Sequence, residues 1–447
     1  MDGRNRWTCL AAMVWMTLGA FSCGETGGGV SLPRQGFAFP VGVAAIPEGF
    51  ALVVNSNFDR TYQSGSVSVI DLNQVEALGC MQEPGRCRGQ ELISPIVAGG
   101  VSIGHYASGV EMLVTAGRTL AAVPIRDNNQ VVFMDLDIGT GSLGEPSLAL
   151  TCSRTGAIED LTRFPTCEDP AYRISFPQIN DPFDVQWLQL PTAGGETSLM
   201  ALVSFLRSNR IEAVRVPVRG SQDILKSEYA YGLRTDGTGD LAYSPGTDRV
   251  FASGRSRESM FTPVYYMEPS AMVEASSAGA TEVLPGSALN LYPDFLGADT
   301  RSIDILGDGV TAAVLLRNPN LLAFLDMSAD PTRDGAPSLT YRGHVVVGPY
   351  PSRVRVHGDL VFVTGAQEDT LHVVDAKART LIKVLEGEEQ LCRGPFDIGF
   401  YDRAAATPPI HWGLIACFEQ DVVAVLDLNP DNETFLQVIA EIGEPKD

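Results

Sequence analysis

The chain is poor in basic residues and lacks the motifs of the common cofactor-binding folds. Of its 447 residues, 32 are Lys or Arg and 54 are Asp or Glu, which gives a formal net charge of −22. A chain this acidic repels phosphate groups and has no basic stripe, which argues against nucleic acid as a partner. It contains no P-loop, no Gly-x-Gly-x-x-Gly after a strand and no Cys-x-x-Cys-His haem motif.

Metal-ligand spacings and long helical periodicity are also missing. The chain has no Cys-x-x-Cys, and His344, His357, His372 and His411 are scattered one per strand or loop. The sequence therefore does not predict a histidine or cysteine metal site. Apolar residues make up 45% of the chain, which is enough to bury a large core and excludes disorder.

The N-terminus has the arrangement of an export signal. Arg4 and Arg6 precede an apolar run from Trp7 to Phe21, which is too short to span a bilayer comfortably. Ser22 and Cys23 follow the run, and a Gly-rich stretch comes after Cys23. This arrangement resembles a bacterial lipoprotein signal, in which such a cysteine is lipidated and becomes the new N-terminus. An ordinary secretory signal cleaved nearby is the alternative.

The resemblance implies where the mature protein lies. We expect residues 1–22 to be the signal peptide and residues 23–35 to be a lipidated tether. The protein is then exported and held by its lipid anchor alone in the bacterial cell envelope, at the outer membrane or the periplasmic face.

Export also accounts for the remaining cysteines. Six of the eight cysteines lie beyond Cys9 and Cys23. An oxidising compartment keeps disulfides closed, and short loops cost little entropy to close. Proximity in the sequence favours three disulfides: Cys80 with Cys87, Cys152 with Cys167, and Cys392 with Cys417.

A unit of two apolar strands joined by a polar turn occurs seven times. The second strand often ends in Asp, and the copies lie roughly 59 residues apart. The seven strand pairs are Ala51–Asn55 with Ser66–Asp71, Leu120–Pro124 with Gln130–Asp135, Leu202–Leu206 with Ile211–Arg215, Arg249–Ser253 with Val264–Tyr266, Ala313–Leu316 with Leu321–Asp326, Leu360–Thr364 with Thr370–Asp375, and Gly413–Cys417 with Val422–Asp427.

Strand repeats of this length are typical of a β-propeller. An earlier apolar segment in each copy, such as those that begin at Phe183 and Phe396, supplies an innermost strand. The sequence thus predicts an all-β fold, a seven-bladed propeller of four-stranded antiparallel blades, as one domain over residues 36–447.

Two further features concern the ends and the spacing of the repeats. Excess length around residues 76–105, 139–180 and 267–300 is interpreted as insertions. Phe435–Ala440 is expected to form the last strand. Val30–Gln35 either pairs beside that strand and closes the ring or belongs to the tether.

The repeats resemble those of a known family. The strands Ala51–Asn55 and Leu360–Thr364 are each followed by a strand that ends in Asp. They are similar to the YVTN-type repeats of bacterial seven-bladed propellers, a group that includes lactonase-like propellers. The resemblance covers nearly the whole mature chain, and it implies the fold more than an activity, because propellers host many functions. Blade three departs from the pattern at Arg215, and blade four departs at residues 256–263, which replace a tight turn.

Propeller topology gathers charged residues at one mouth of the central channel. The inner strands begin on the face that also carries the turns between second and third strands, and the long turn Phe58–Gly65 forms a lip there. The inner-strand starts carry Gly42, Gly109, Asp184, Asp240, Arg353 and Asp397, with Asp304 two positions late. The turns carry Arg126, Arg207, Arg255 and Arg317. We therefore predict a charged mouth with acids nearest the axis and arginines outside.

Three interpretations of this mouth remain open. Several carboxylates around one axis suit Ca²⁺, which takes about 6–8 oxygen ligands. The same carboxylates, Asp184, Asp240 and Asp397, are those that the resemblance to lactonase-like propellers implies for metal-assisted hydrolysis. Alternatively, Asp and Arg pair between blades and stabilise the ring.

The third interpretation is the one we favour, so we assign no catalytic residue and no metal ligand. We expect a binding scaffold that recognises an envelope protein or a glycan, rather than an enzyme. A metal-dependent, lactonase-like hydrolase is the alternative.

Overall fold

The structure is a computed structural model. It describes residues 30, 36–78, 97–115, 117–140, 146–153, 164–179, 181–191, 197–219, 221, 223–233, 235–255, 263–271, 284–285, 287–290, 299–329, 337, 340–406 and 408–446. The predicted signal peptide, Cys23, and the predicted pair Cys80 and Cys87 lie outside these residues.

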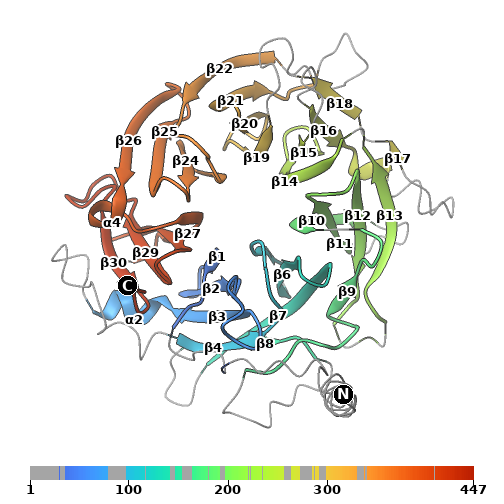
Figure 1. Ribbon diagram of the computed structural model, residues 1–447, viewed down its shortest axis with the longest axis horizontal. Coiled ribbons are helices and arrows are strands. Elements are labelled where there is room, and N and C mark those ends of the chain that lie inside the picture. The colour runs from blue at the N-terminus through green and yellow to red at the C-terminus, as the bar shows by residue number, and fades with distance from the viewer. Residues whose placement is uncertain are drawn as a thin grey trace, which may run out of the picture.

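Seven antiparallel sheets are arranged radially around one axis, as Figure 1 shows. Each sheet has four main strands, which follow one another in the chain and lie in that order from the axis outward. In blade four the last of them is β18, because β17 pairs with blade three. The prediction of a seven-bladed β-propeller with four-stranded blades is confirmed.

The strands of blades one to three are β1 (Pro40–Ile46), β2 (Phe50–Asn55), β3 (Ser66–Asp71) and β4 (Val97–Ser102); β5 (Glu111–Val114), β6 (Thr119–Ile125), β7 (Gln130–Thr140) and β8 (Pro146–Thr151); and β10 (Pro182–Pro191), β11 (Thr197–Phe205), β12 (Arg210–Val216) and β13 (Lys226–Gly232). Two short strands are added at blades two and three: β9 (Arg173–Ser175), which pairs with β7, and β17 (Leu284–Pro285), which runs parallel to β13.

The strands of blades four to seven are β14 (Gly237–Ser244), β15 (Arg249–Arg255), β16 (Pro263–Met267) and β18 (Ser287–Asn290); β19 (Thr300–Ile305), β20 (Thr311–Arg317), β21 (Asn320–Asp326) and β22 (Thr340–Val346); β23 (Arg353–His357), β24 (Leu360–Gly365), β25 (Thr370–Asp375) and β26 (Thr380–Glu386); and β27 (Pro395–Arg403), β28 (Ile410–Cys417), β29 (Val422–Asp427) and β30 (Val438–Ile442).

The segments interpreted as insertions hold the outer strands of three blades. β4, β8 and β18 lie within residues 76–105, 139–180 and 267–300, so that interpretation was wrong for these parts of the chain. The physical reason is exposure. Most residues of β8 are exposed or half-buried, so no apolar run marks the strand, whereas every residue of β2 is buried.

The hydrophobic core is divided into seven clusters, and each cluster lies between two neighbouring blades. One cluster joins β1 and β2 of blade one to β28 and β29 of blade seven through residues such as Val43, Val53 and Trp412. The six others join successive blades around the ring in the same way. The second and third strands face two such clusters, which explains why their apolar runs are unbroken.

The ends of the ring differ from the expected closing strand. The last strand of blade seven, β30, begins at Val438, three residues after the predicted start. Val30 is the one described residue of the segment 30–35, and it pairs with Tyr62 in the turn between β2 and β3. Its carbonyl oxygen accepts from the Gln63 N–H at 3.1 Å.

Two of the three predicted disulfides are present. Cys152 pairs with Cys167 and Cys392 pairs with Cys417, with Cα–Cα distances of 5.2 and 6.0 Å. The first disulfide joins Cys152, which follows β8, to Cys167, whose N–H donates to the Ser102 carbonyl of β4 at 3.0 Å. The helices α2 (Leu72–Ala77) and α4 (Gly387–Gln390) are short, and no helix among the described residues has the length and hydropathy to cross a membrane.

Blades three and four depart from the repeat pattern, and residues 256–262 of the blade-four turn lie outside the described residues. Arg215 stands at the end of β12 where other blades have Asp, and its guanidinium pairs with Glu228 of the neighbouring β13 at 2.6 Å. In blade four, β15 and β16 are in register with Ser253 opposite Val264. The repeat is therefore retained in both blades.

Candidate functional site: the channel mouth

Each of the seven blades brings one residue, within its inner strand or just before it, to an equivalent position around the axis. Each of these residues directly precedes a buried aliphatic residue, and most lie at a register irregularity near the start of the strand. We call them the axial ring: Gly42, Gly109, Asp184, Asp240, Ser302, Arg353 and Asp397. Six of them are predicted positions. In blade five the position is taken by Ser302, and Asp304 lies two residues further along β19, as expected.

Arg353 of β23 crosses the axis. Its Nη1 contacts a carboxylate oxygen of Asp240 and lies 3.6 Å from Oδ1 of Asp184, while its Nη2 donates to the Ser108 carbonyl at 3.0 Å. Only 1% of Arg353 is exposed, and Asp240 is fully buried. One guanidinium from blade six thus joins residues of blades two, three and four.

Glycine at two ring positions makes room for this side chain. A Cβ at Gly109 would lie 3.2 Å from the Arg353 Nη2, and a Cβ at Gly42 would lie 2.7 Å from the Gly109 Cα. Blades one and two therefore approach the axis more closely than a residue with a side chain would allow.

A second arginine of the same strand pairs with the remaining axial carboxylate. Arg355 donates from Nε and Nη2 to the two oxygens of Asp397 at 3.1 and 3.3 Å, and its Nη2 also contacts Glu111 at 3.0 Å. Arg355 and Glu111 were missed by the sequence reasoning. Both lie two residues after a ring position, which places them on the same face of their strands, so the period of two could have identified them.

Asp184, Asp240 and Asp304 also accept hydrogen bonds from the next blade. Oδ2 of Asp184 accepts from the Leu241 N–H at 2.8 Å, and Oδ2 of Asp304 accepts from the Val356 N–H at 2.8 Å. Asp240 accepts from the Ser302 hydroxyl. These bonds connect β10 to β14, β14 to β19 and β19 to β23.

Burial shifts the pKa values of three carboxyl groups at the mouth upward. Burial, with help from the nearby Asp240 and Glu111, raises the pKa of Asp184 well above its usual value. Desolvation raises the pKa of Glu111 to about 7 against the opposing attraction of an arginine, and burial raises the pKa of Asp304 to about 6. The mouth therefore holds protons at a pH at which exposed carboxyl groups have lost them.

The ring of Phe183 contacts the guanidinium groups of two arginines. The guanidinium carbon of Arg353 lies 4.6 Å from the ring centroid, and that of Arg301 lies 4.9 Å away. Burial and the positive charge of Arg353 lower the pKa of Arg301 to about 10. The apolar residue of the Pro-Phe-Asp context in blade three thus supports the two arginines by cation–π contact.

The four turn arginines lie outside the axial ring, at the turns where they were predicted. Three of them pair with an aspartate just before an inner strand, and the fourth lies over an aromatic ring. The contacts are Arg126 Nε to Asp181 Oδ1 at 3.0 Å, Arg207 Nε to Asp181 Oδ2 at 2.9 Å, Arg255 Nε to Asp299 Oδ1 at 3.4 Å, and Arg317 over Tyr350 at 5.9 Å. The expected order of charges needs one correction, because Arg353 and Arg355 lie among the acids at the axis.

The channel-mouth face also carries a cluster of aromatic rings. We call it the aromatic surface: Phe39, Phe58, Tyr106 and Phe418. Phe58 lies in the turn predicted to form a lip and contacts the three others at centroid distances of 5.4 to 6.3 Å, yet 53% of it is exposed. Two cations border the cluster, Arg60 over Tyr106 at 5.0 Å and Lys446 over Phe39 at 4.4 Å.

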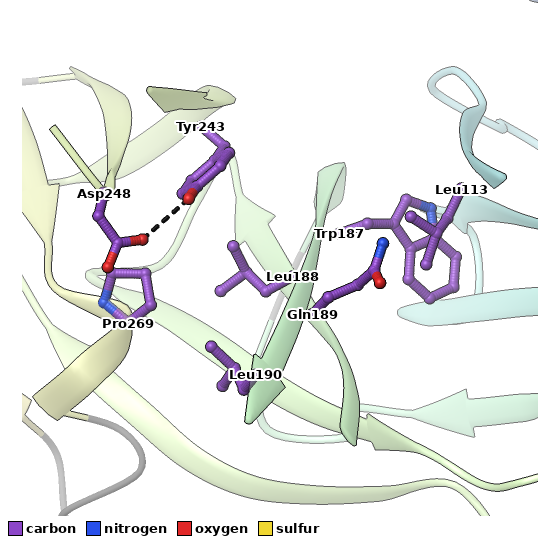
Figure 2. A pocket seen from close by; sticks show the side chains of 8 residues that line it. All are labelled: Leu113, Trp187, Leu188, Gln189, Leu190, Tyr243, Asp248 and Pro269. Atoms are coloured by element: carbon purple, nitrogen blue, oxygen red, sulfur yellow. Dashed lines mark hydrogen bonds between the residues drawn. The ribbon is translucent and has the colours of Figure 1, made fainter. Parts of the chain in front are cut away.

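The opposite face has a hollow between blades two, three and four. Figure 2 shows Trp187 and the leucines of the β10 end lining one side, with Tyr243 and Asp248 on the other. Its volume is about 270 Å³. The Tyr243 hydroxyl donates to Asp248 at 2.8 Å, and burial with this bond raises the pKa of Tyr243 to about 12. The hollow is mainly apolar and lies away from the axial arginines.

One further group on that opposite face was missed by the sequence reasoning. His357, Asp402 and His411 converge there from three strands. The spacing of these residues in the sequence gave no indication of it, because they belong to two blades.

Comparison with known proteins supports the fold. No family model matches the chain, and no curated protein matches its sequence. Among solved structures, the chain is similar to hydrazine synthase of Kuenenia stuttgartiensis with a TM-score of 0.52 and 11% identity, over 91% of this chain and 99% of that one.

Two other solved structures align over most of the chain. They are Sqt1 of Saccharomyces cerevisiae (TM-score 0.47, 9% identity, 89% of this chain and 98% of that one) and the β-propeller domain of Cps50 (Swd1) of Myceliophteria thermophila (TM-score 0.48, 11% identity, 88% and 94%). At such identities the likeness to these structures concerns the fold alone. The protein is a seven-bladed β-propeller whose central channel is crossed by buried ion pairs.

Proposed function

We propose that this propeller is a non-catalytic binding scaffold that recognises a protein partner through its channel-mouth face. The observation that carries the proposal is the pairing at the axis. Asp184, Asp240 and Asp397 each lie beside the guanidinium of Arg353 or Arg355. Carboxylates that are buried and already paired are not available to a ligand, so recognition falls to the exposed rim of the same face.

The aromatic surface is the part of that rim suited to a protein partner. The cores of protein interfaces are enriched in aromatic residues and arginine. The exposed ring of Phe58 packs on three other aromatic rings. Arg60, nearby in the same turn, pairs with Asp127 at 2.6 Å. Rigid aromatic residues of this kind supply binding energy at little entropic cost.

A calcium site or a hydrolytic metal site at the axis is not favoured by this geometry. Ca²⁺ needs several carboxylate or carbonyl oxygens directed at one point. Here Arg353 occupies the space between Asp184 and Asp240, and the Asp397 oxygens accept from Arg355. A cation bound there would have to displace two guanidinium groups.

The repeat family and the location belong to the same proposal. The strand pairs that resemble YVTN repeats are β2 with β3 and β24 with β25, and we assign the chain to that type of propeller. Lipidation at Cys23 would tether the ring to the bacterial cell envelope, which makes an envelope protein the expected partner and a glycan the alternative.

Site-specific crosslinking tests the proposal. A photoreactive phenylalanine analogue at position 58 should form a discrete protein adduct in intact cells, whereas the same analogue at Tyr341, an aromatic residue 36% exposed on the outer strand β22, should not. The purified partner should then bind the Phe58→Ser variant at least tenfold more weakly. Equal affinity of the partner for the parent protein and the Phe58→Ser variant, or the same adducts from positions 58 and 341, would refute the role of this face.

A further inference from the structure

Three potential metal ligands meet on the face opposite the channel mouth. His357 is the last residue of β23, Asp402 is the penultimate residue of β27, and His411 is the second residue of β28. Oδ1 of Asp402 lies 2.7 Å from Nδ1 of His411 and 3.4 Å from Nε2 of His357. One ligand atom from each residue lies within 4.8 Å of the others.

Strand geometry fixes this arrangement. Alternate residues of β23 face blade seven, so Arg355 contacts Asp397 and His357, two residues later, stacks on Phe400 with ring centroids 4.5 Å apart. Asp402 and His411 are direct cross-strand partners in the antiparallel pair of β27 and β28. The three side chains therefore converge because of the register of two blades and do not depend on a loop.

We propose that His357, Asp402 and His411 bind a divalent transition-metal ion, with zinc as the ion to test. Two imidazole nitrogens and one carboxylate oxygen form a three-ligand set that leaves a coordination position open for water or a partner group. Imidazole selects zinc and its neighbours over Ca²⁺ and Mg²⁺, which prefer oxygen ligands.

Two of the three ligand-atom distances require little movement, and the third lies within 4.8 Å. Ligands about 2.0–2.2 Å from a tetrahedral zinc ion lie roughly 3.3 Å from one another. The His357 to Asp402 distance is already 3.4 Å, and the His411 to Asp402 hydrogen bond of 2.7 Å opens slightly when the metal replaces its proton. All three side chains are partly exposed, at 25%, 47% and 33% in chain order, so an ion reaches them from solvent.

The carboxylate is not engaged by another cation in the described chain. The adjacent Arg403 points to blade one, where its guanidinium contacts Glu76 at 2.6 Å and Asn73 at 3.2 Å. Among the described residues, the ion pairs of Asp402 are with the two histidines alone. This separates the group from the axial carboxylates, which hold arginines.

Metal titration of the purified chain, made without a histidine-containing tag, tests the proposal. Calorimetry with Zn²⁺ should show a one-to-one binding event that His357→Ala, His411→Ala and Asp402→Asn each weaken at least tenfold. The control His344→Ala removes a histidine of blade five and should leave the affinity unchanged. Co²⁺ should give the intense visible absorption of a four-coordinate site in the parent chain and lose it in the first two variants.

Loss of zinc binding must be distinguished from loss of folding. Circular dichroism and the melting temperature without metal establish that each variant is folded. Equal Zn²⁺ affinity in the parent and all three triad variants, or the absence of binding at millimolar Zn²⁺, would overturn the proposal. Neither result bears on the partner surface around Phe58, which lies on the other face.

Discussion

Replacing Arg353 with methionine should destabilise the whole ring. The guanidinium is 1% exposed and contacts Asp240, Asp184 and the Ser108 carbonyl. Methionine keeps much of the length but leaves buried carboxylates without their cation. Removing one partner of a buried ion pair costs about 3–5 kcal/mol. Unfolding entropy of about 2.1 cal/mol/K per residue gives roughly 0.9 kcal/mol/K for a ring of this size, so the melting temperature should fall by about 3–6 °C if the ring unfolds as one unit.

The assay is thermal unfolding followed by circular dichroism, with denaturant titration for the free energy. The exposed pair of Lys377 with Asp359 supplies the control, since Lys377→Met should leave the melting temperature unchanged. Adding Asp240→Asn to Arg353→Met should cost less than the two single substitutions together, by more than about 1 kcal/mol, because the orphaned charge is removed. If Arg353→Met melts within about 1 °C of the parent, the axial ion pairs do not hold the ring together.

The remaining predictions concern pH, calcium, disulfides and the N-terminus. Glu111 keeps its proton in the folded protein at a pH at which the unfolded chain has released it. Its contribution to stability should be full below about pH 4.5 and be lost as the pH rises to its folded pKa of about 7, so Glu111→Gln should flatten this part of the pH-dependent melting curve. Millimolar Ca²⁺ should leave the melting temperature unchanged, and a rise that Asp240→Asn abolishes would favour the axial metal site instead. Replacing Cys152 and Cys167 by serine should cost about 3 kcal/mol of unfolding free energy in denaturant titrations, since their loop spans 15 residues. Mass spectrometry of the mature chain should find a lipidated Cys23 as the first residue, and another unmodified terminus would exclude the lipoprotein.

The sequence predicted the strands that are buried on both sides and overlooked those that are not. β2 and β29 are buried throughout, and their continuous apolar runs define the repeat. The outer strands β22 and β26 are mostly exposed, so most of their side chains need not be apolar and their sequences show no comparable pattern. This difference explains why the number of blades could be predicted while β8 was taken for part of an insertion.

The candidate site was predictable where it follows the repeat and not where it depends on side-chain direction. Aligning the copies located the axial ring, including the late position of Asp304. It did not indicate that Arg353 reaches across the axis, because that contact depends on the absence of a side chain at Gly109. The group at His357 was also beyond sequence reasoning, since His357 meets the cross-strand pair of Asp402 and His411 only through the packing of β23 on β27.

The ring closes by packing and side-chain bonding, because blades one and seven share no strand in the described chain. A Cβ at Gly399 of β27 would lie 2.3 Å from the Val43 carbonyl oxygen of β1, so the two inner strands are in direct contact. The Phe39 N–H donates to Asp421 at 2.6 Å across the same junction, and the Tyr401 hydroxyl donates to Glu76 at 2.8 Å. Each inter-blade core holds two neighbours together, whereas the guanidinium of Arg353 connects blade six to blades two, three and four. Buried ion pairs are expensive to desolvate and contribute little net stability as pairs. Their value in this ring is geometric, since a single axial residue restrains blades that share no hydrophobic contact.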